Sequence, residues 1–245
     1  MQKNNDSLIK MANMNSYALI LAGGSGSRMQ TETPKSFIKI NGLFIFEYSL
    51  LAFAKNPHIS HVILVVPQNF LALTKKHIQN TPCPKIHSII AGGKNRFQSS
   101  ALGISQIKEK EAFIMIHDAA RPLIRQTIIN KNWNALQKFE AVNTLIPLKD
   151  SIVQLGDSKE ITSLNRHQFQ LVQTPQSFKL SCIKKAQTKA EQDSLDSITD
   201  DFALVSHYKT GTYTSVEGEQ DNFKITHPID LKIFEFILSQ KAAKT

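Results

Sequence analysis

The residues best suited to chemistry gather at three turns, and the first is rich in glycine. It runs Ala22-Gly23-Gly24-Ser25-Gly26-Ser27-Arg28, and Pro34-Lys35 follows shortly after. Glycine lets backbone N–H groups approach a phosphate closely, because no Cβ intervenes. Arg28 and Lys35 add two cations at the same bend. The pattern indicates a loop that binds a triphosphate, although GxGxR alone is a weak signal and a tight turn without a ligand is an equal alternative.

The second turn, Ala91 to Ser100, contains another glycine pair and opens a segment with helical spacing. At the carboxyl end of a strand, such a turn is expected to line the same crevice as the first. Ser99 and Ser100 can contribute hydroxyl groups there, or can simply lie on the helix surface.

The third turn, Ile116-His117-Asp118-Ala119-Ala120-Arg121-Pro122, brings an acid and a base close together. Asp118 can face a cation or a hydroxyl group, and Arg121 can face an anion. His117 is better explained as a structural histidine than as a catalytic base. There is no Ser-His-Asp arrangement among these residues.

Short aliphatic strands and helical segments alternate along the chain and must position these turns. The strands are expected at 17–21, 62–66, 86–90, 113–116 and 142–146, and the helices at 44–55, 69–79, 97–108 and 126–139. This order predicts an α/β fold: a Rossmann-like, doubly wound, largely parallel sheet with helices on both faces. Ligands in such folds bind beyond the carboxyl ends of the strands.

One segment, Asp150 to Arg166, breaks the alternation. It has no helical stripe, and Gly156-Asp157-Ser158 separates two strand-like pieces. The pattern predicts a projecting β-hairpin arm. An isolated hairpin is marginal in water, so the arm must pack on a partner subunit or fold back on its own domain, and the residues alone leave both open.

The composition is that of one ordinary globular unit. The chain has 245 residues, of which 41% are hydrophobic and 20% charged, and no run is long and apolar enough to span a membrane. Residues 1–16 lack the pattern of a signal peptide and are expected to be a disordered extension, with a single domain over 17–245. Cys83 and Cys182 are too few for a disulfide framework, which favours the cytoplasm.

A net charge of +9 favours an anionic partner. A basic nucleic-acid-binding module is the alternative from another class, but the cations cluster at glycine turns without interleaved aromatic residues. A dinucleotide-dependent dehydrogenase is disfavoured, because Met29 stands at the third glycine position of the fingerprint and no acidic residue closes the second strand.

The three turns, in this order and together with Gln173-Thr174-Pro175-Gln176, Thr199-Asp200-Asp201 and Asn222 to Thr226, resemble the 2-C-methyl-D-erythritol 4-phosphate cytidylyltransferase family from Tyr17 to about Leu238. The resemblance implies a homodimeric α/β nucleotidyltransferase of isoprenoid biosynthesis. In this family the phosphate of methylerythritol phosphate attacks the α-phosphorus of CTP, and pyrophosphate leaves with the help of Mg²⁺.

The resemblance also implies roles for single residues. Catalytic cations fall on Arg28, Lys35 and Lys224. Nucleotide-binding residues fall on Ala22, Gly23, Gly24, Gly26, Gly93, Arg96, Ser99 and Asp118, and Asp118 is also the implied metal ligand. Residues for the second substrate fall on Arg121, Ser151, Arg166 and Thr174. Ser151 and Arg166 would reach the neighbouring subunit's site from the arm, and Thr174 belongs to a Thr-Pro-Gln turn beside that site. Asp200 and Asp201 are expected to cap a helix rather than to bind metal.

Some positions depart from the family pattern. Gly23 stands where a second alanine is usual, Ser36 replaces a glutamine, and Ser151 replaces a threonine. The Ala-Gly-Gly sequence also occurs in ribitol 5-phosphate cytidylyltransferases, so that activity is the alternative function. Ala119-Ala120 and the Thr-Asp-Asp run are closer to the methylerythritol branch.

Overall fold

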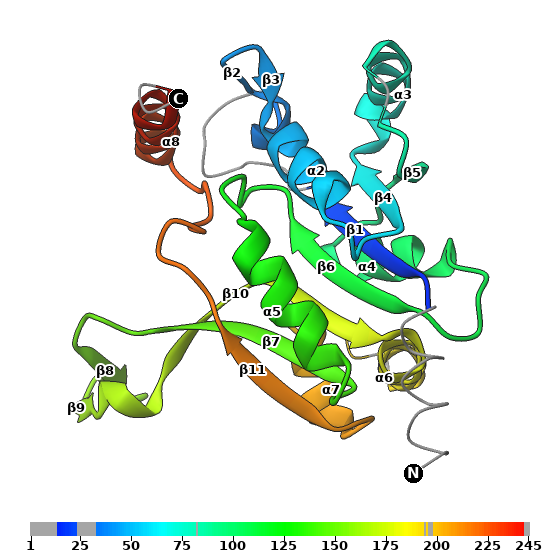
Figure 1. Ribbon diagram of the computed structural model, residues 1–245. Helices are drawn as coiled ribbons and strands as arrows, with labels where there is room; N and C mark the ends of the chain where they lie inside the picture. Colours follow the sequence, from blue (N-terminus) through cyan, green and yellow to red (C-terminus); the bar gives the residue numbers. More distant parts are fainter. Residues whose placement is uncertain (1–13, 24–32, 82, 194, 196–197, 243–245) are drawn as a thin grey trace.

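The structure is a computed structural model that describes residues 14–23, 33–81, 83–193, 195 and 198–242 (Figure 1). Its main strands confirm the predicted alternation. They are β1 (Ser16–Leu21), β4 (His61–Val66), β5 (Ile86–Ala91), β6 (Phe113–Asp118), β7 (Ala141–Pro147), β10 (Gln170–Lys179) and β11 (Tyr213–Glu217). β1 begins at Ser16, one residue inside the segment expected to be an extension, and residues 1–13 lie outside the described part.

Within the described residues, these seven strands form one sheet in the order β11-β7-β10-β6-β1-β4-β5. β1 pairs in parallel with β4 and β6, β4 with β5, and β7 with β11. Only β10 runs antiparallel to its neighbours, β6 and β7. The prediction of a largely parallel, Rossmann-like sheet is confirmed.

The helices that cover the sheet are slightly shorter than predicted. They are α2 (Ile45–Lys55), α3 (Leu71–Asn80), α4 (Arg96–Ser105), α5 (Gln126–Leu136), α6 (Leu180–Gln192), α7 (Asp201–Tyr208) and α8 (Pro228–Ala242). Short 3-10 turns, η2 (Lys35–Phe37), η3 (Gln68–Phe70) and η4 (Arg166–Gln168), join some of them. The segment predicted as one helix over 69–79 divides into η3 and α3.

Alternate residues of β1 build the two halves of the core. Ala18 and Ile20 face the side that α2 and α5 cover, whereas Leu19 and Leu21 face α4, α6 and α7. A strand buried on both faces is nearly continuously apolar, and all six residues of β1 are buried, with Ser16 at its start as the polar exception. The sheet is therefore the rigid base on which the turns at its carboxyl edge are held.

The predicted arm is present as a hairpin of its own. β8 (Ile152–Leu155) pairs antiparallel with β9 (Ile161–Leu164), separate from the central sheet. Figure 1 shows it extending away from the body of the subunit, beyond the ends of β7 and β10. Leu155 and Ile161 on the hairpin are 69% and 67% exposed, so in this chain the arm does not fold back on its own domain.

Phe234 of the last helix, α8, packs in a small core with Ile40, Ile45, Leu123 and Ile225. Ile40 belongs to a short hairpin formed by β2 (Lys39–Ile40) and β3 (Leu43–Phe44). Pro228 opens α8, and the Asp230 carboxylate accepts hydrogen bonds from the backbone N–H groups of Thr226 and His227, both at 2.7 Å. These are the first-turn roles that proline and aspartate favour. No helix in the described ranges is both long and apolar enough to cross a bilayer.

Candidate active site

The glycine turns meet at the carboxyl edge of the sheet. The Ala22 N–H donates to the Val65 carbonyl of β4, and the Gly92 N–H donates to the Val66 carbonyl, both at 2.8 Å. A Cβ built on Gly23 would lie 3.9 Å from the Ser99 hydroxyl oxygen. The first and second turns therefore line one region, as predicted, while Gly24, Gly26 and Arg28 lie outside the described residues.

The second turn is shaped by the side chains at the start of α4. Asn95 caps the helix by accepting from the Gln98 N–H at 2.8 Å, and the Ser99 hydroxyl accepts from the Gly93 N–H at 3.1 Å. A Cβ on Gly93 would lie 2.5 Å from the Gln98 Cβ, so this position admits only glycine without rearrangement. Ser99 thus fixes the turn from within rather than lying on the helix surface.

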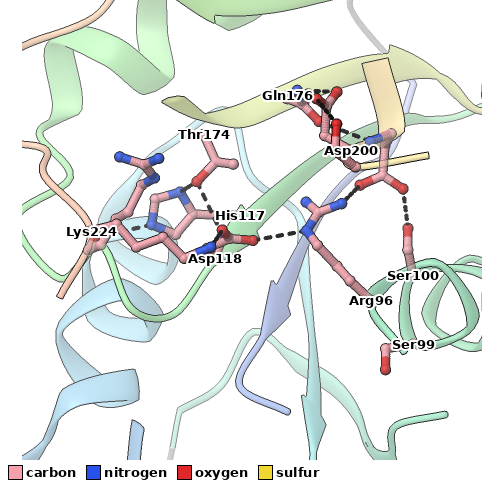
Figure 2. Close-up of polar contacts among 12 residues, drawn as sticks. Arg96, Ser99, Ser100, His117, Asp118, Thr174, Gln176, Asp200 and Lys224 are labelled. Carbon is pink, nitrogen blue, oxygen red and sulfur yellow. Dashed lines mark hydrogen bonds and ion pairs between the residues drawn. The ribbon is translucent and has the colours of Figure 1, made fainter. Parts of the chain in front are cut away.

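Asp118, at the end of β6, is the centre of the charged cluster (Figure 2). Its Oδ2 accepts from the Lys224 ammonium at 2.6 Å, and its Oδ1 accepts from Arg96 Nε at 3.2 Å. Burial alone would raise the pKa of the carboxyl, but Arg96, Lys224 and Arg121 outweigh burial and hold the pKa far below its usual range. Asp118 is therefore an anion at every physiological pH.

The backbone of Asp118 is fixed by a short chain of hydrogen bonds. Its N–H donates to the Thr174 hydroxyl at 3.1 Å, and that hydroxyl lies 3.0 Å from Nδ1 of His117. The other ring nitrogen of His117 lies 3.1 Å from the Arg121 carbonyl, which can only accept. Burial lowers the pKa of His117 to about 4. The histidine is consequently neutral, with its proton on Nε2, and the prediction of a structural histidine agrees with this arrangement.

Thr174 lies in a strand, so the prediction that it belongs to a turn is wrong. It sits within β10 and forms a cis peptide bond with Pro175, where the pairing of β10 with β7 changes register. The strand continues through this peptide bond because Gln173 before it and Gln176 after it form hydrogen bonds inside the protein. Thr174 is 5% exposed, so its hydroxyl holds the Asp118 backbone from the protein interior.

Lys35 and Lys224 are brought together although they lie at opposite ends of the chain. Lys35 is buried in η2, and its ammonium donates to the Ile225 carbonyl at 2.8 Å. The loop that carries Lys224 is anchored on both sides. Ile225 N–H donates to the Ala120 carbonyl at 2.8 Å, and Asn222 donates to the Thr174 carbonyl at 2.9 Å. Lys35, one predicted catalytic cation, is thus anchored on the residue next to Lys224, another.

Arg121 adopts a more internal position than its predicted contact with substrate suggests. Its two terminal nitrogens donate to backbone carbonyls, Nη1 to Asn222 at 2.9 Å and Nη2 to Val172 at 3.2 Å. Arg121 Nε and Arg96 Nη2 are buried and have no hydrogen-bond partner within the described residues. Buried donors without acceptors are costly, so a ligand or water in this region would satisfy them.

Sequence reasoning missed a second acidic group in the cluster. Asp201 Oδ2 accepts from Arg96 Nη1 at 2.6 Å. Burial disfavours the charged form of Arg96, but Asp201 and Asp118 outweigh burial and raise its pKa. Asp200 caps α7 through the Ala203 N–H, as predicted, whereas Asp201 is an ion-pair partner rather than a cap. In the sequence, the only signal for Asp201 was that it is an acidic residue at the expected start of a helix.

The two residues predicted on the arm are not part of this cluster. Ser151 and Arg166 are both exposed, and Arg166 donates to the Lys149 carbonyl at 2.6 Å at the base of the arm. The arm follows the carboxyl end of β7 and extends away from the body of the subunit (Figure 1). Within one chain, therefore, the arm does not complete the site.

A divalent cation would find one suitable carboxylate here. No group of three or more His, Cys, Asp or Glu side chains in the described ranges could hold a metal. Asp118 is ionised, and each of its oxygens has further acceptor capacity beyond its one contact. Mg²⁺ commonly binds one or two carboxylates and completes its shell with phosphates and water, so the residues present fit a metal that a nucleotide brings with it.

Comparison with known proteins decides the family. The family model described as IspD, 2-C-methyl-D-erythritol 4-phosphate cytidylyltransferase, matches residues 16–240. The chain belongs to this family. It is therefore a nucleotidyltransferase enzyme with the α/β fold of that family.

Relatives cover nearly the whole chain. The 2-C-methyl-D-erythritol 4-phosphate cytidylyltransferase of Lachnospira eligens is 38% identical over 88% of this chain and 96% of its own length. A crystal structure of 4-diphosphocytidyl-2C-methyl-D-erythritol synthase from Anaerococcus prevotii is 26% identical, with a TM-score of 0.81 over 94% of this chain and 99% of that chain. A bifunctional ribulose 5-phosphate reductase/CDP-ribitol pyrophosphorylase of Haemophilus influenzae is 32% identical over 91% of this chain but only 48% of its own length.

Proposed function

We propose that this enzyme transfers the cytidylyl group of CTP to 2-C-methyl-D-erythritol 4-phosphate, giving 4-diphosphocytidyl-2-C-methyl-D-erythritol and pyrophosphate for isoprenoid precursor synthesis. Membership of the family supports the reaction. The observation that carries it in this chain is that Arg96 and Lys224 both contact the carboxylate of Asp118, while Lys35 is anchored on Ile225, the residue next to Lys224.

The charge balance of this cluster suits a polyphosphate. Arg96, Arg121 and Lys224 contribute three positive charges around Asp118, whereas Asp118 and Asp201 contribute two negative ones. The difference, three minus two, is a net positive charge, which favours an anionic ligand. Nucleotidyl transfer needs charge neutralisation and positioning more than a covalent nucleophile, and both ring nitrogens of buried His117 are already engaged, by the Thr174 hydroxyl and the Arg121 carbonyl.

In the proposed mechanism the glycine turns bind the nucleotide, with Ala22, Gly23, Gly93 and Ser99 near the base and Gly24 and Gly26 along the phosphates. An oxygen of the methylerythritol phosphate attacks the α-phosphorus of CTP. A new P–O bond forms there, the bond to the β-phosphate breaks, and pyrophosphate leaves. Lys35, Lys224 and Arg28 stabilise the negative charge on the phosphates as these bonds change.

Mg²⁺ is proposed as the cofactor, with Asp118 as its protein ligand. Bound there with the phosphates, the cation would neutralise charge on the nucleotide. Asp118 is suited to the role because it stays ionised beside Arg96 and Lys224.

The second substrate is proposed to lie between two subunits of a homodimer. Arg121 and Thr174 would line it from one chain, while Ser151 and Arg166 would reach it from the partner's arm. The exposed aliphatic side chains of the hairpin support this assembly, because an unpartnered two-stranded arm is unfavourable in water. A cytoplasmic location is proposed from Cys83 and Cys182, both of which are free thiols.

Ribitol 5-phosphate is the alternative acceptor, and the relative that carries a CDP-ribitol pyrophosphorylase name motivates testing it. The experiment is to incubate the protein with Mg²⁺, CTP and either sugar phosphate and to measure pyrophosphate. Release with methylerythritol phosphate, and far slower release with ribitol 5-phosphate, is expected. Release with ribitol 5-phosphate alone would replace the proposal with the alternative.

A further inference from the structure

Asp201 is a buried carboxylate for which the reaction above requires no direct role. It is 1% exposed and accepts two hydrogen bonds of 2.6 Å, one from Arg96 Nη1 at Oδ2 and one from the Ser100 hydroxyl at Oδ1. Arg96 contacts both this carboxylate and that of Asp118, and Figure 2 shows its contact with Asp118. The position of Asp201 therefore bears directly on a residue of the nucleotide site.

The Asp201 carboxylate is held by three separate elements. It is the first residue of α7, where the helix dipole favours a negative charge. Ser100 reaches it from α4. Its backbone N–H donates at 3.1 Å to Oε1 of Gln176 on β10, and the Gln176 amide donates to Asp200 at 2.8 Å. With this many anchors, the carboxylate has little freedom to move.

Arg96 takes its orientation from both acids. Nη1 contacts Asp201 while Nε contacts Asp118, so the planar guanidinium is fixed at two points. Without the charge of Asp201, Arg96 would keep Asp118 as its only carboxylate and would be drawn toward it. Arg96 would then compete with Lys224, which contacts the same carboxylate at 2.6 Å.

We propose that Asp201 is a positioning residue for nucleotide binding and transfer: it holds Arg96 in place, so that Asp118 and Lys224 keep the arrangement that the nucleotide requires. The proposal rests on the proposed function, because it assigns the cluster around Asp118 to CTP. It extends that function to a residue on α7 that acts through Arg96 rather than by touching the reacting atoms.

The neighbouring residue provides a matched control. Asp200 caps α7 and contacts Gln176, but Arg96 is not among its hydrogen-bond partners. Asp200→Ala removes the cap and is expected to destabilise the protein. A role of Asp201 that is only structural would make the two variants alike, whereas positioning through Arg96 would make them differ in their response to CTP.

The experiment compares wild type, Asp201→Asn and Asp200→Ala by calorimetric titration with CTP and Mg²⁺, steady-state kinetics and thermal unfolding. Asp201→Asn removes the negative charge beside Arg96 and leaves one amide oxygen as the acceptor, and its NH₂ can donate to the Ser100 hydroxyl but not to the guanidinium. We expect kcat/KM for CTP to fall on the order of 10²-fold, as a misplacement near 1 Å typically causes, and CTP affinity to fall with it. Asp200→Ala is expected to unfold at a lower temperature while its CTP constants stay within about twofold of wild type.

A double-mutant cycle tests whether the effect passes through Arg96. Adding Asp201→Asn to Arg96→Gln should lower kcat/KM for CTP no further than Arg96→Gln alone, since the charged partner is already gone. Independent, additive losses would overturn the proposal. Wild-type CTP constants in Asp201→Asn, or equal losses in Asp200→Ala, would overturn it as well.

A second variant covers the case in which Asp201→Asn does not fold. Ser100→Ala keeps the ion pair but removes one of the two bonds that orient the carboxylate, and it should lower kcat/KM for CTP about fivefold. An unchanged value would overturn the proposal. Failure of the proposed function has a different signature: the wild type would bind CTP without releasing pyrophosphate, and the calorimetric comparison would still test Asp201. A wild type that does not bind CTP would overturn both.

Discussion

The ammonium of Lys35 donates a hydrogen bond to the Ile225 carbonyl at 2.8 Å across a separation of 190 residues. This contact places a cation from the first turn beside the loop that carries Lys224. It also ties that loop to the body of the domain, because Ile225 is buried in the small core beneath α8. The site is thus assembled from both ends of the chain.

Replacing Lys35 should remove most of the activity while leaving the fold intact. Lys35→Ala eliminates one charge near the phosphates, and the loss of one such donor typically lowers kcat on the order of 10² to 10³-fold. Steady-state kinetics at saturating CTP measure the effect, and circular dichroism checks the fold. Lys39→Ala removes an exposed lysine nearby and serves as the control. Near-normal kcat in Lys35→Ala would show that this cation is not catalytic.

Arg166 on the arm should discriminate between the two substrates. A guanidinium can grip a phosphate through two parallel hydrogen bonds, which an ammonium cannot reproduce. Arg166→Lys is therefore expected to raise KM for methylerythritol phosphate far more than KM for CTP. The control, Lys159→Asn, removes a cation from the turn of the same arm and keeps a residue that tolerates the positive φ of 64° there. Equal increases in both constants would argue against the arm as the site of the second substrate.

The proposed exchange of arms predicts complementation between two inactive chains. If each arm completes the other chain's site, mixing Lys35→Ala with Arg166→Ala produces heterodimers in which one site carries both defects and the other carries none. With random assortment, half of the dimers would be mixed and about a quarter of wild-type activity would return. Mass spectrometry verifies the exchange, and turnover measures the recovery. No recovery after verified exchange would mean that each site belongs to a single chain.

His117 should make stability depend on pH. Its pKa is about 4 in the folded protein and 6.5 in the unfolded chain, so between these values the unfolded state binds more protons. The contribution is fully present above pH 6.5 and is lost as pH falls toward 4, by on the order of 3 kcal/mol.

Denaturant unfolding at pH 7 and pH 4.5, with a chelator present, measures this loss. His117→Gln should show a smaller decrease in the free energy of unfolding than wild type, and His207→Gln, which removes an exposed histidine, should behave like wild type. Equal decreases in wild type and His117→Gln would contradict the neutral, buried state of His117.

Much of this arrangement could be predicted because it depends on local patterns. The continuous apolar runs around Ile20, Ile89 and Ile116 predict parallel strands, and the turns that follow them predict where Gly23, Gly93 and Asp118 lie. β10 could not be predicted in the same way. Gln173, Thr174 and Gln176 read as a polar turn around Pro175, and they are accommodated in a strand only because Asn222, Asp118 and Asp200 supply partners from distant segments.

The charged cluster could likewise be predicted from the sequence only in part. The glycines and cations of the turns are visible in the sequence, since their types are unusual at strand ends. Asp201 was interpreted as a cap because an acid at the start of a helix usually is one. Its contact with Arg96 joins residues that lie 105 positions apart, and only the packing of α7 against the sheet brings them together.

The most direct test of the proposed reaction uses methylerythritol phosphate whose phosphate oxygens are a heavy isotope, incubated with the wild type, Mg²⁺ and unlabelled CTP. If that phosphate attacks the α-phosphorus, every labelled oxygen stays in the cytidylyl product and none enters pyrophosphate, as mass spectrometry of both products would show. Pyrophosphate that carries the label, or pyrophosphate formed without a labelled cytidylyl product, would contradict the proposed transfer.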